Sequence, residues 1–126
     1  MKIFLIIILQ FVSFFIFSQF SENPDWTFNR TDHKLHLFVG YSSAFIVSSL
    51  ITFKQDTLNI KNGLIYGGVV SSSLGVGKEI VWDMLLNKGV PTYPDLVYTL
   101  TGAVIGLLQT YIIYHVHKNN NNKTKL

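Results

Sequence analysis

The stretch GVGKEIVWD, residues 75–83, decides the fold because it places Lys78, Glu79 and Asp83 at the end of an otherwise apolar run of small residues. Its Gly-Lys pair resembles the end of a phosphate-binding loop. Such a loop needs Gly five residues before that pair and Ser or Thr directly after it. Those two positions hold Ser72 and Glu79. The pattern therefore argues against nucleotide binding, and the three charges need another explanation.

The composition indicates a membrane protein. The chain has 126 residues, enough for one domain, and 48% of them are hydrophobic while only 13% are charged. The net charge of +3 is small and scattered, which argues against a nucleic-acid partner. The chain contains no cysteine, which excludes disulfides and thiolate metal sites.

The N-terminus has the pattern of a secretory signal. Residues 1–18 contain one Lys followed by an Ile/Leu/Phe run that ends with a small residue, Ser18. We expect a signal peptide here, with an uncleaved signal anchor, a fourth helix, as the alternative. Residues 19–34 are polar and are predicted to be an extracytoplasmic lead-in.

The rest of the chain predicts an all-α fold, an integral membrane bundle of three short transmembrane helices over residues 35–116. The first span, 35–53, lacks a fully charged residue and approaches the length of about 20 residues that crosses a bilayer core. The third span is 96–116. Residues 117–126 are polar and of low complexity, and we predict a disordered cytoplasmic tail.

The second span has to continue through the charges of GVGKEIVWD. The apolar run that starts at Gly63 covers only about 22 Å before it reaches Lys78, at about 1.5 Å per residue, whereas the bilayer core is about 30 Å thick. We therefore place Lys78 and Glu79 near the headgroup layer, with Trp82 as an interfacial anchor.

The distribution of charge predicts the orientation. Three spans that start outside put the 54–62 loop and the tail in the cytoplasm, and these segments carry Lys54, Lys61, Lys118, Lys123 and Lys125. Six of the seven acidic residues fall on the outer side: Glu22, Asp25, Asp32, Glu79, Asp83 and Asp95. The sequence thus predicts a protein of the bacterial inner membrane whose polar residues face the periplasm.

Each predicted span carries a polar pair, four residues apart, at its outer end, and residues so spaced share a helix face. The pairs are Asp32 with His36, Glu79 with Asp83, and Asp95 with Thr99. Small residues continue each face inward: Gly40, Ala44 and Ser48; Gly75, Ser71, Gly67 and Gly63; Gly102 and Gly106. Stripes of this kind allow close helix contacts in lipid, and rows of i+4 spacing predict helices that cross at an angle.

If the stripes face one another, the polar pairs converge into one cluster with Lys34 and Lys78 near it. Charges at membrane depth are costly unless paired, so they are candidates for function. Simpler roles stay open: Asp32 and Asp95 as helix N-caps, Lys78 with Glu79 as an interfacial pair, and Asp83 as a solvated side chain. We interpret His33, His115 and His117 as interfacial residues.

The motif resembles a known family. Its elements are D-x3-H from Asp32, G-x-x-K-E-x-x-x-D from Gly75, and an Asp95 followed by Gly102 and Gly106. It is similar to the YfiM-like family of small bacterial envelope proteins, which look like distant relatives of the VanZ-like membrane proteins. The resemblance implies an envelope location and a short helical bundle without an established activity. The chain departs from the family pattern at His33, where the family has Lys, and at Thr99, where it has an acid or amide.

Two functions are consistent with these residues. In the first, a non-enzymatic membrane module binds an anionic or zwitterionic lipid headgroup, or an envelope protein partner, without a cofactor, through Asp32, Lys34, His36, Lys78, Glu79, Asp83 and Asp95. In the second, a metal-assisted hydrolase acts on a lipid-linked phosphate, with His36, Glu79 and Asp83 as metal ligands. The sequence favours the first, because no nucleophile with a base is apparent. Surplus small-residue faces make a homodimer a further expectation.

Overall fold

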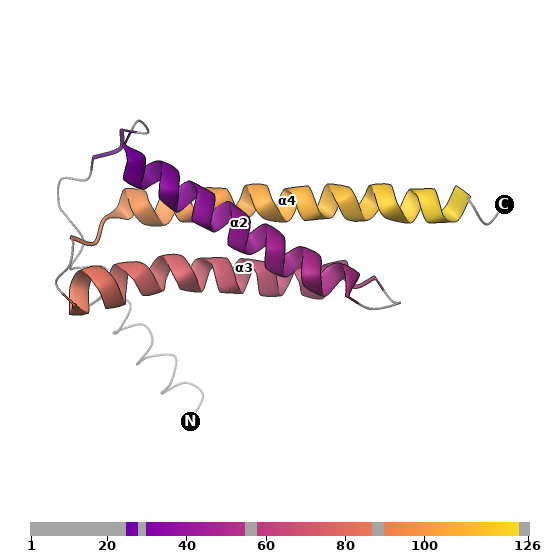
Figure 1. The fold of residues 1–126 in the computed structure, drawn as a ribbon, viewed down its shortest axis with the longest axis horizontal. Helices are drawn as coiled ribbons and strands as arrows, with labels where there is room; N and C mark the ends of the chain where they lie inside the picture. The colour runs from indigo at the N-terminus through magenta and orange to yellow at the C-terminus, as the bar shows by residue number, and fades with distance from the viewer. Residues whose placement is uncertain (1–24, 28–29, 55–57, 87–89, 124–126) are drawn as a thin grey trace, which may run out of the picture.

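The computed structural model describes residues 25–27, 30–54, 58–86 and 90–123, and every regular element among them is helical. The predicted signal segment, residues 1–18, lies outside the described residues. Three helical rods pack side by side (Figure 1). They are α2 (Thr31–Phe53), α3 (Ile60–Gly77), which continues into the π-helix η1 (Lys78–Leu85), and α4 (Tyr93–Lys123).

Local sequence accounts for the two helix starts after the first. Asn59 caps α3, since its side-chain oxygen accepts a hydrogen bond of 3.1 Å from the backbone N–H of Asn62. At the start of α4, the hydroxyl of Thr92 accepts a long hydrogen bond of 3.4 Å from the backbone N–H of Asp95. Pro94, in the first turn, is suited to that position because its ring fixes φ and its missing N–H has no helical partner there.

Small residues set the distance between the helices, as the sequence predicts. A Cβ on Gly40 of α2 would collide with the backbone of Thr99 in α4, and a Cβ on Gly102 would collide with the carbonyl of Leu37. On α3, a Cβ on Gly67 would lie 2.8 Å from the carbonyl oxygen of Ala44. Close backbone approach of this kind is typical of helix pairs in membranes.

The helices cross as expected for rows of i+4 spacing. Helix α2 lies diagonally across both α3 and α4 (Figure 1). Its start, the end of η1 and the start of α4 meet at one end of the molecule, while α4 extends beyond its neighbours at the other.

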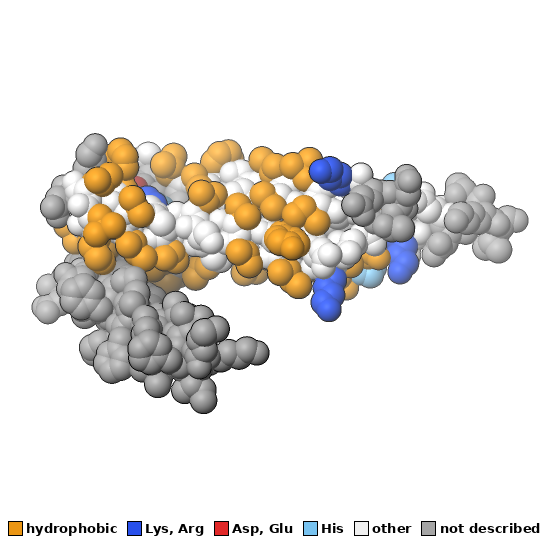
Figure 2. All heavy atoms as spheres, turned by 90° about the horizontal axis from the view of Figure 1, so that it is seen from below, with side chains coloured by type: hydrophobic (Ala, Val, Ile, Leu, Met, Phe, Trp, Pro, Cys, Tyr) orange, Lys and Arg blue, Asp and Glu red, His pale blue; other side chains and the backbone are white. Residues whose placement is uncertain are grey.

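The polarity of the molecule is inverted relative to a water-soluble bundle. The fully buried side chains include those of Ser48, Thr52, Ser71 and Thr110, whereas large apolar side chains such as Phe38 remain more than half exposed. Apolar side chains are spread over the visible face from one end to the other, and Lys and Arg gather mainly toward one end (Figure 2). Helices α2 and α4 are long and apolar enough to cross a membrane. An apolar surface of this extent indicates an apolar environment.

Three sequence predictions need correction. Helix α2 begins at Thr31 with Arg30 before it, so Asp32 lies within the first turn and is not the N-cap. Asp95 also lies inside its helix, and Thr92 occupies the capping position. The predicted disorder from residue 117 is wrong up to Lys123, because no Gly or Pro ends α4 there and Asn121 lies 3.1 Å from the ring of His117 one turn earlier.

Candidate functional site: a polar cluster where three helices meet

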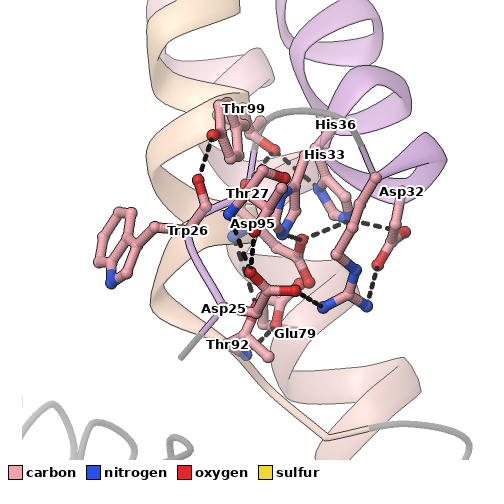
Figure 3. A network of polar contacts seen from close by, with 12 residues as sticks. Asp25, Trp26, Thr27, Asp32, His33, His36, Glu79, Thr92, Asp95 and Thr99 are labelled. Atoms are coloured by element: carbon pink, nitrogen blue, oxygen red, sulfur yellow. Dashed lines mark hydrogen bonds and ion pairs between the residues drawn. The ribbon is translucent and has the colours of Figure 1, made fainter. Parts of the chain in front are cut away.

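The predicted convergence of polar side chains occurs where the start of α2, η1 and the start of α4 meet. Figure 3 shows His33 and His36 from α2 turned toward Asp95 of α4, with Glu79 from η1 on the far side of Asp95. We call this group the polar cluster; its members are Asp32, His33, His36, Lys78, Glu79, Asp83, Asp95 and Thr99.

Lys78 is held by three carboxylates. Its Nζ lies 2.6 Å from Asp83 Oδ2, 3.0 Å from Glu79 Oε1 and 3.6 Å from Asp95 Oδ2. The side chains of Glu79 and Asp83 are almost completely buried, while that of Lys78 is about one-third exposed. Buried carboxylates are costly unless paired, so Lys78 stabilises both of them and keeps its own exposed side available.

The π-helical turn explains why Lys78 reaches Asp83. In a π-helix the hydrogen bonds run from residue i to i+5, and the backbone N–H of Leu86 donates such a bond of 3.1 Å to the carbonyl of Val81. Lys78 and Asp83 are also five residues apart, so the wider turn brings them together on one side. Turns of this type occur frequently at functional sites.

Glu79 joins η1 to the start of α4. Its Oε2 accepts a hydrogen bond of 2.8 Å from the backbone N–H of Thr92, while its Oε1 faces Lys78. Both oxygens of this buried carboxylate therefore have partners, and Thr92, the residue before α4, is held against η1. The contacts give Glu79 a positioning role.

Asp95 is the centre of the cluster. Its Oδ2 faces Lys78, while its Oδ1 lies 3.6 Å from His33 Nε2 and 3.9 Å from His36 Nε2. His36 Nε2 also lies 3.8 Å from Asp32 Oδ1. Only 3% of Asp95 is exposed, and His33 is fully buried, so these contacts lie in the interior of the helix junction.

A more exposed layer covers this junction. Arg30 lies 3.6 Å from Asp25 and 3.9 Å from Asp32, and the carbonyl oxygen of Thr27 lies 2.7 Å from His33 Nδ1. Hydrogen bonds from the hydroxyl and the backbone N–H of Thr27 lower the pKa of Asp25 below its ordinary value. Tyr98 ties this layer to α4, because its hydroxyl donates a hydrogen bond of 3.0 Å to the carbonyl of Trp26.

A cavity of about 150 Å³ opens beside the cluster, between α2 and α3. Its outer walls are apolar, formed by side chains that are 39–59% exposed: Leu35, Val39 and Leu74. Its polar lining residues are Asp32, His36, Lys78 and Thr99. The cavity therefore joins the apolar flank of the molecule to the polar cluster.

The structure brings together six of the seven site residues predicted for headgroup binding. Lys34, the seventh, is exposed on α2 and does not line the cavity. The predicted metal set of His36, Glu79 and Asp83 is not assembled, because Glu79 and Asp83 hold Lys78. Among the described residues, the ligand atoms that lie within 4.8 Å of one another belong to Asp32, His36 and Asp95.

Sequence reasoning missed His33. We interpreted it as interfacial, but it is fully buried, its ring stacks on Tyr98 with a centroid distance of 4.6 Å, and it faces Asp95. The signal was its spacing: His33 and His36 are three residues apart and so share a helix face. The early start of α2 brings both into the helix.

Comparison with known proteins gives no match: no family model, no curated protein and no solved structure is significantly similar to this chain.

Proposed function

We propose that this chain is a small cell-envelope membrane protein whose polar cluster binds the headgroup of an anionic or zwitterionic lipid. The observation that carries the proposal is the cavity between α2 and α3, with its apolar outer walls and its polar lining. An acyl chain would lie against Leu35, Val39 and Leu74, while the headgroup would reach Lys78 and His36. Binding sites that are apolar with a few polar groups commonly orient an amphiphilic ligand in this way.

Lys78 is the proposed contact for a lipid phosphate. It lines the cavity, and its side chain keeps 34% of its surface exposed despite three carboxylate neighbours. Glu79 and Asp83 lie behind it and fix the position of its ammonium group. A preorganised cation loses less entropy when it binds an anion than a free lysine would.

The acidic residues favour a headgroup that also carries an amine. Asp32 lines the cavity and its side chain is 45% exposed, so one carboxylate is accessible beside the cation. A zwitterionic headgroup can place its phosphate at Lys78 and its ammonium at Asp32. Lys78 from η1 and Asp32 from α2 thus supply opposite charges within one cavity.

The location in the envelope is also part of this proposal. We place α2, α3 and α4 across the bacterial inner membrane, with the polar cluster on the periplasmic side. Lys54 at the end of α2 and Lys61 at the start of α3 lie at the end of the bundle away from the polar cluster. This agrees with the tendency of basic residues to stay in the cytoplasm. Membership of the YfiM-like family remains a proposal that rests on the motif residues.

Lipid binding is tested on the detergent-purified full chain by native mass spectrometry, with phosphatidylglycerol, phosphatidylethanolamine and phosphatidylcholine as probes. We expect Lys78→Gln to weaken binding of all three by about tenfold or more, since each carries the phosphate and a hydrogen bond to a charged group contributes about 1.5–3 kcal/mol. Lys61→Gln, at the other end of the bundle, is the matched control and should bind as the wild type does.

A second variant separates lipid binding from folding. Val39→Phe adds volume to the cavity wall without removing a charge from the cluster, and Val39 is already 39% exposed. It should reduce lipid binding while the unfolding transition stays unchanged. Wild-type lipid binding in both Val39→Phe and Lys78→Gln would refute headgroup binding at this cavity.

A further inference from the structure

The neighbours of His33 and His36 determine which ring nitrogen of each carries hydrogen. His33 Nδ1 lies 2.7 Å from the carbonyl oxygen of Thr27, which can only accept, so this nitrogen donates. His36 Nδ1 lies 3.0 Å from the hydroxyl oxygen of Thr99. That hydroxyl already donates its single hydrogen to the carbonyl of Asp95 at 2.9 Å, so His36 Nδ1 donates as well.

In the neutral rings, both Nε2 atoms then present lone pairs, and both face the same carboxylate oxygen. Asp95 Oδ1 lies 3.6 Å from one Nε2 and 3.9 Å from the other, and it has no hydrogen-bond partner. His33 Nε2 also has none, although His33 is fully buried. Acceptors that converge without a donor between them require a positive species, and unsatisfied buried polar atoms are rare.

The surroundings favour a metal ion. Asp32 Oδ1 adds a further anionic oxygen 3.8 Å from His36 Nε2, and the ligand atoms of Asp32, His36 and Asp95 lie within 4.8 Å of one another. In a tetrahedral Zn²⁺ site with bonds of 2.0–2.2 Å, neighbouring ligand atoms lie about 3.3–3.6 Å apart. The separations from His36 Nε2, 3.8 Å to Asp32 and 3.9 Å to Asp95, exceed this by a few tenths of an ångström. All three ligand atoms lie within 4.8 Å of one another, so side-chain rotations have to draw the two carboxylate oxygens closer together.

The second layer has the arrangement that metal-binding histidines use. Such a histidine donates its other ring N–H to an oxygen, which fixes its tautomer and orientation. The Thr99 hydroxyl does this for His36. Lys78, the nearest cation, is already paired with Glu79 and Asp83, so its repulsion of a metal ion is reduced.

We propose that Asp32, His36 and Asp95 bind a divalent transition metal such as Zn²⁺. These three ligands tie the start of α2 to the start of α4 and leave the fourth tetrahedral position to water or another small ligand. The inference does not rest on lipid binding, although Asp32 and His36 also line the cavity while Asp95 does not.

The first experiment uses the wild-type full chain, purified in detergent and titrated with Zn²⁺ alone. Nitrogen-15 NMR of the imidazoles should show hydrogen on Nδ1 of His33 and His36, and Zn²⁺ should shift the Nε2 resonance of His36 at one equivalent per chain. Rings that carry hydrogen on both nitrogens and do not respond to Zn²⁺ would overturn the proposal, since protons would then supply the positive charge.

The second experiment measures affinity in variants by isothermal titration with Zn²⁺. His36→Ala removes a ligand and should weaken binding at least tenfold, as even the loss of an outer-layer partner costs about 10–100-fold. His117→Ala removes an exposed histidine at the far end of α4 and should leave the affinity unchanged. Equal affinity in the wild type, His36→Ala and His117→Ala would place the metal elsewhere. Lys78→Gln should retain Zn²⁺ while it loses lipid, which separates this site from the proposed function.

Discussion

Replacing Gly40 with Ala tests the close contact on which both the fold and the polar cluster depend. Gly40 faces the backbone of Thr99, and a Cβ at this position would lie far inside the 3.0 Å limit for real Cβ contacts. Backbone atoms cannot rotate away, so α2 and α4 have to move apart. Gly68 is the matched control, because its added Cβ would meet only the side chain of Leu107, at 3.6 Å.

The magnitude follows from comparing the two glycines. Both lie inside helices, so Ala at either position gains about 0.5–1 kcal/mol of helix propensity. Only Gly40→Ala adds the cost of overpacking, which is about 1–3 kcal/mol. The propensity gain is common to both variants, so we expect Gly40→Ala to be less stable than Gly68→Ala by about 1–3 kcal/mol.

The assay is reversible unfolding in mixed micelles of a mild detergent with increasing dodecyl sulfate, followed by the fluorescence of Trp26 and Trp82. Thr99 also holds the ring of His36, so separation of the helices should weaken Zn²⁺ binding in Gly40→Ala and leave it unchanged in Gly68→Ala. Equal stability of the two variants would show that α2 and α4 do not approach as closely as the structure indicates.

Two further predictions concern the helix interior and the orientation. The hydroxyls of Ser48 and Thr110 lie 2.6 Å apart and are fully buried. Each single variant, Ser48→Ala or Thr110→Val, leaves the other hydroxyl without this partner. The double variant should therefore lose less free energy of unfolding than the two single variants lose together. The chain lacks cysteine, so in intact cells an impermeant maleimide should label Trp26→Cys but not Lys61→Cys, and the reverse pattern would contradict the periplasmic orientation.

The sequence predicted the packing faces well because small residues at i+4 spacing allow the backbones of apolar helices to approach closely. Gly40, Gly67 and Gly102 all lie at helix contacts, and the polar pairs converge at one end of the stripes. That inference needed only helix geometry and the cost of isolated charges in lipid.

Side-chain partners were less predictable, because they depend on details of the backbone. The π-helical turn decides that Lys78 pairs with Asp83, and nothing in the periodicity of residues 75–83 distinguishes it from an α-helix. His33 resembled an interfacial residue until the helix start at Thr31 placed it beside Asp95. A shift of one turn at a helix start is within the ordinary error of boundary prediction, yet it changes which residues meet.

Thr99 carries no charge, yet its hydroxyl orients the ring of His36 in the polar cluster. Its hydroxyl accepts from His36 Nδ1 and donates to the carbonyl of Asp95, while its methyl group faces Gly75. Thr99→Val keeps the shape and the methyl contact but removes the acceptor that selects the His36 tautomer. We expect about a 10–100-fold loss of Zn²⁺ affinity with the unfolding transition nearly unchanged, and recovery of affinity in Thr99→Ser. Undiminished Zn²⁺ binding in Thr99→Val would show that the hydroxyl does not orient the ring.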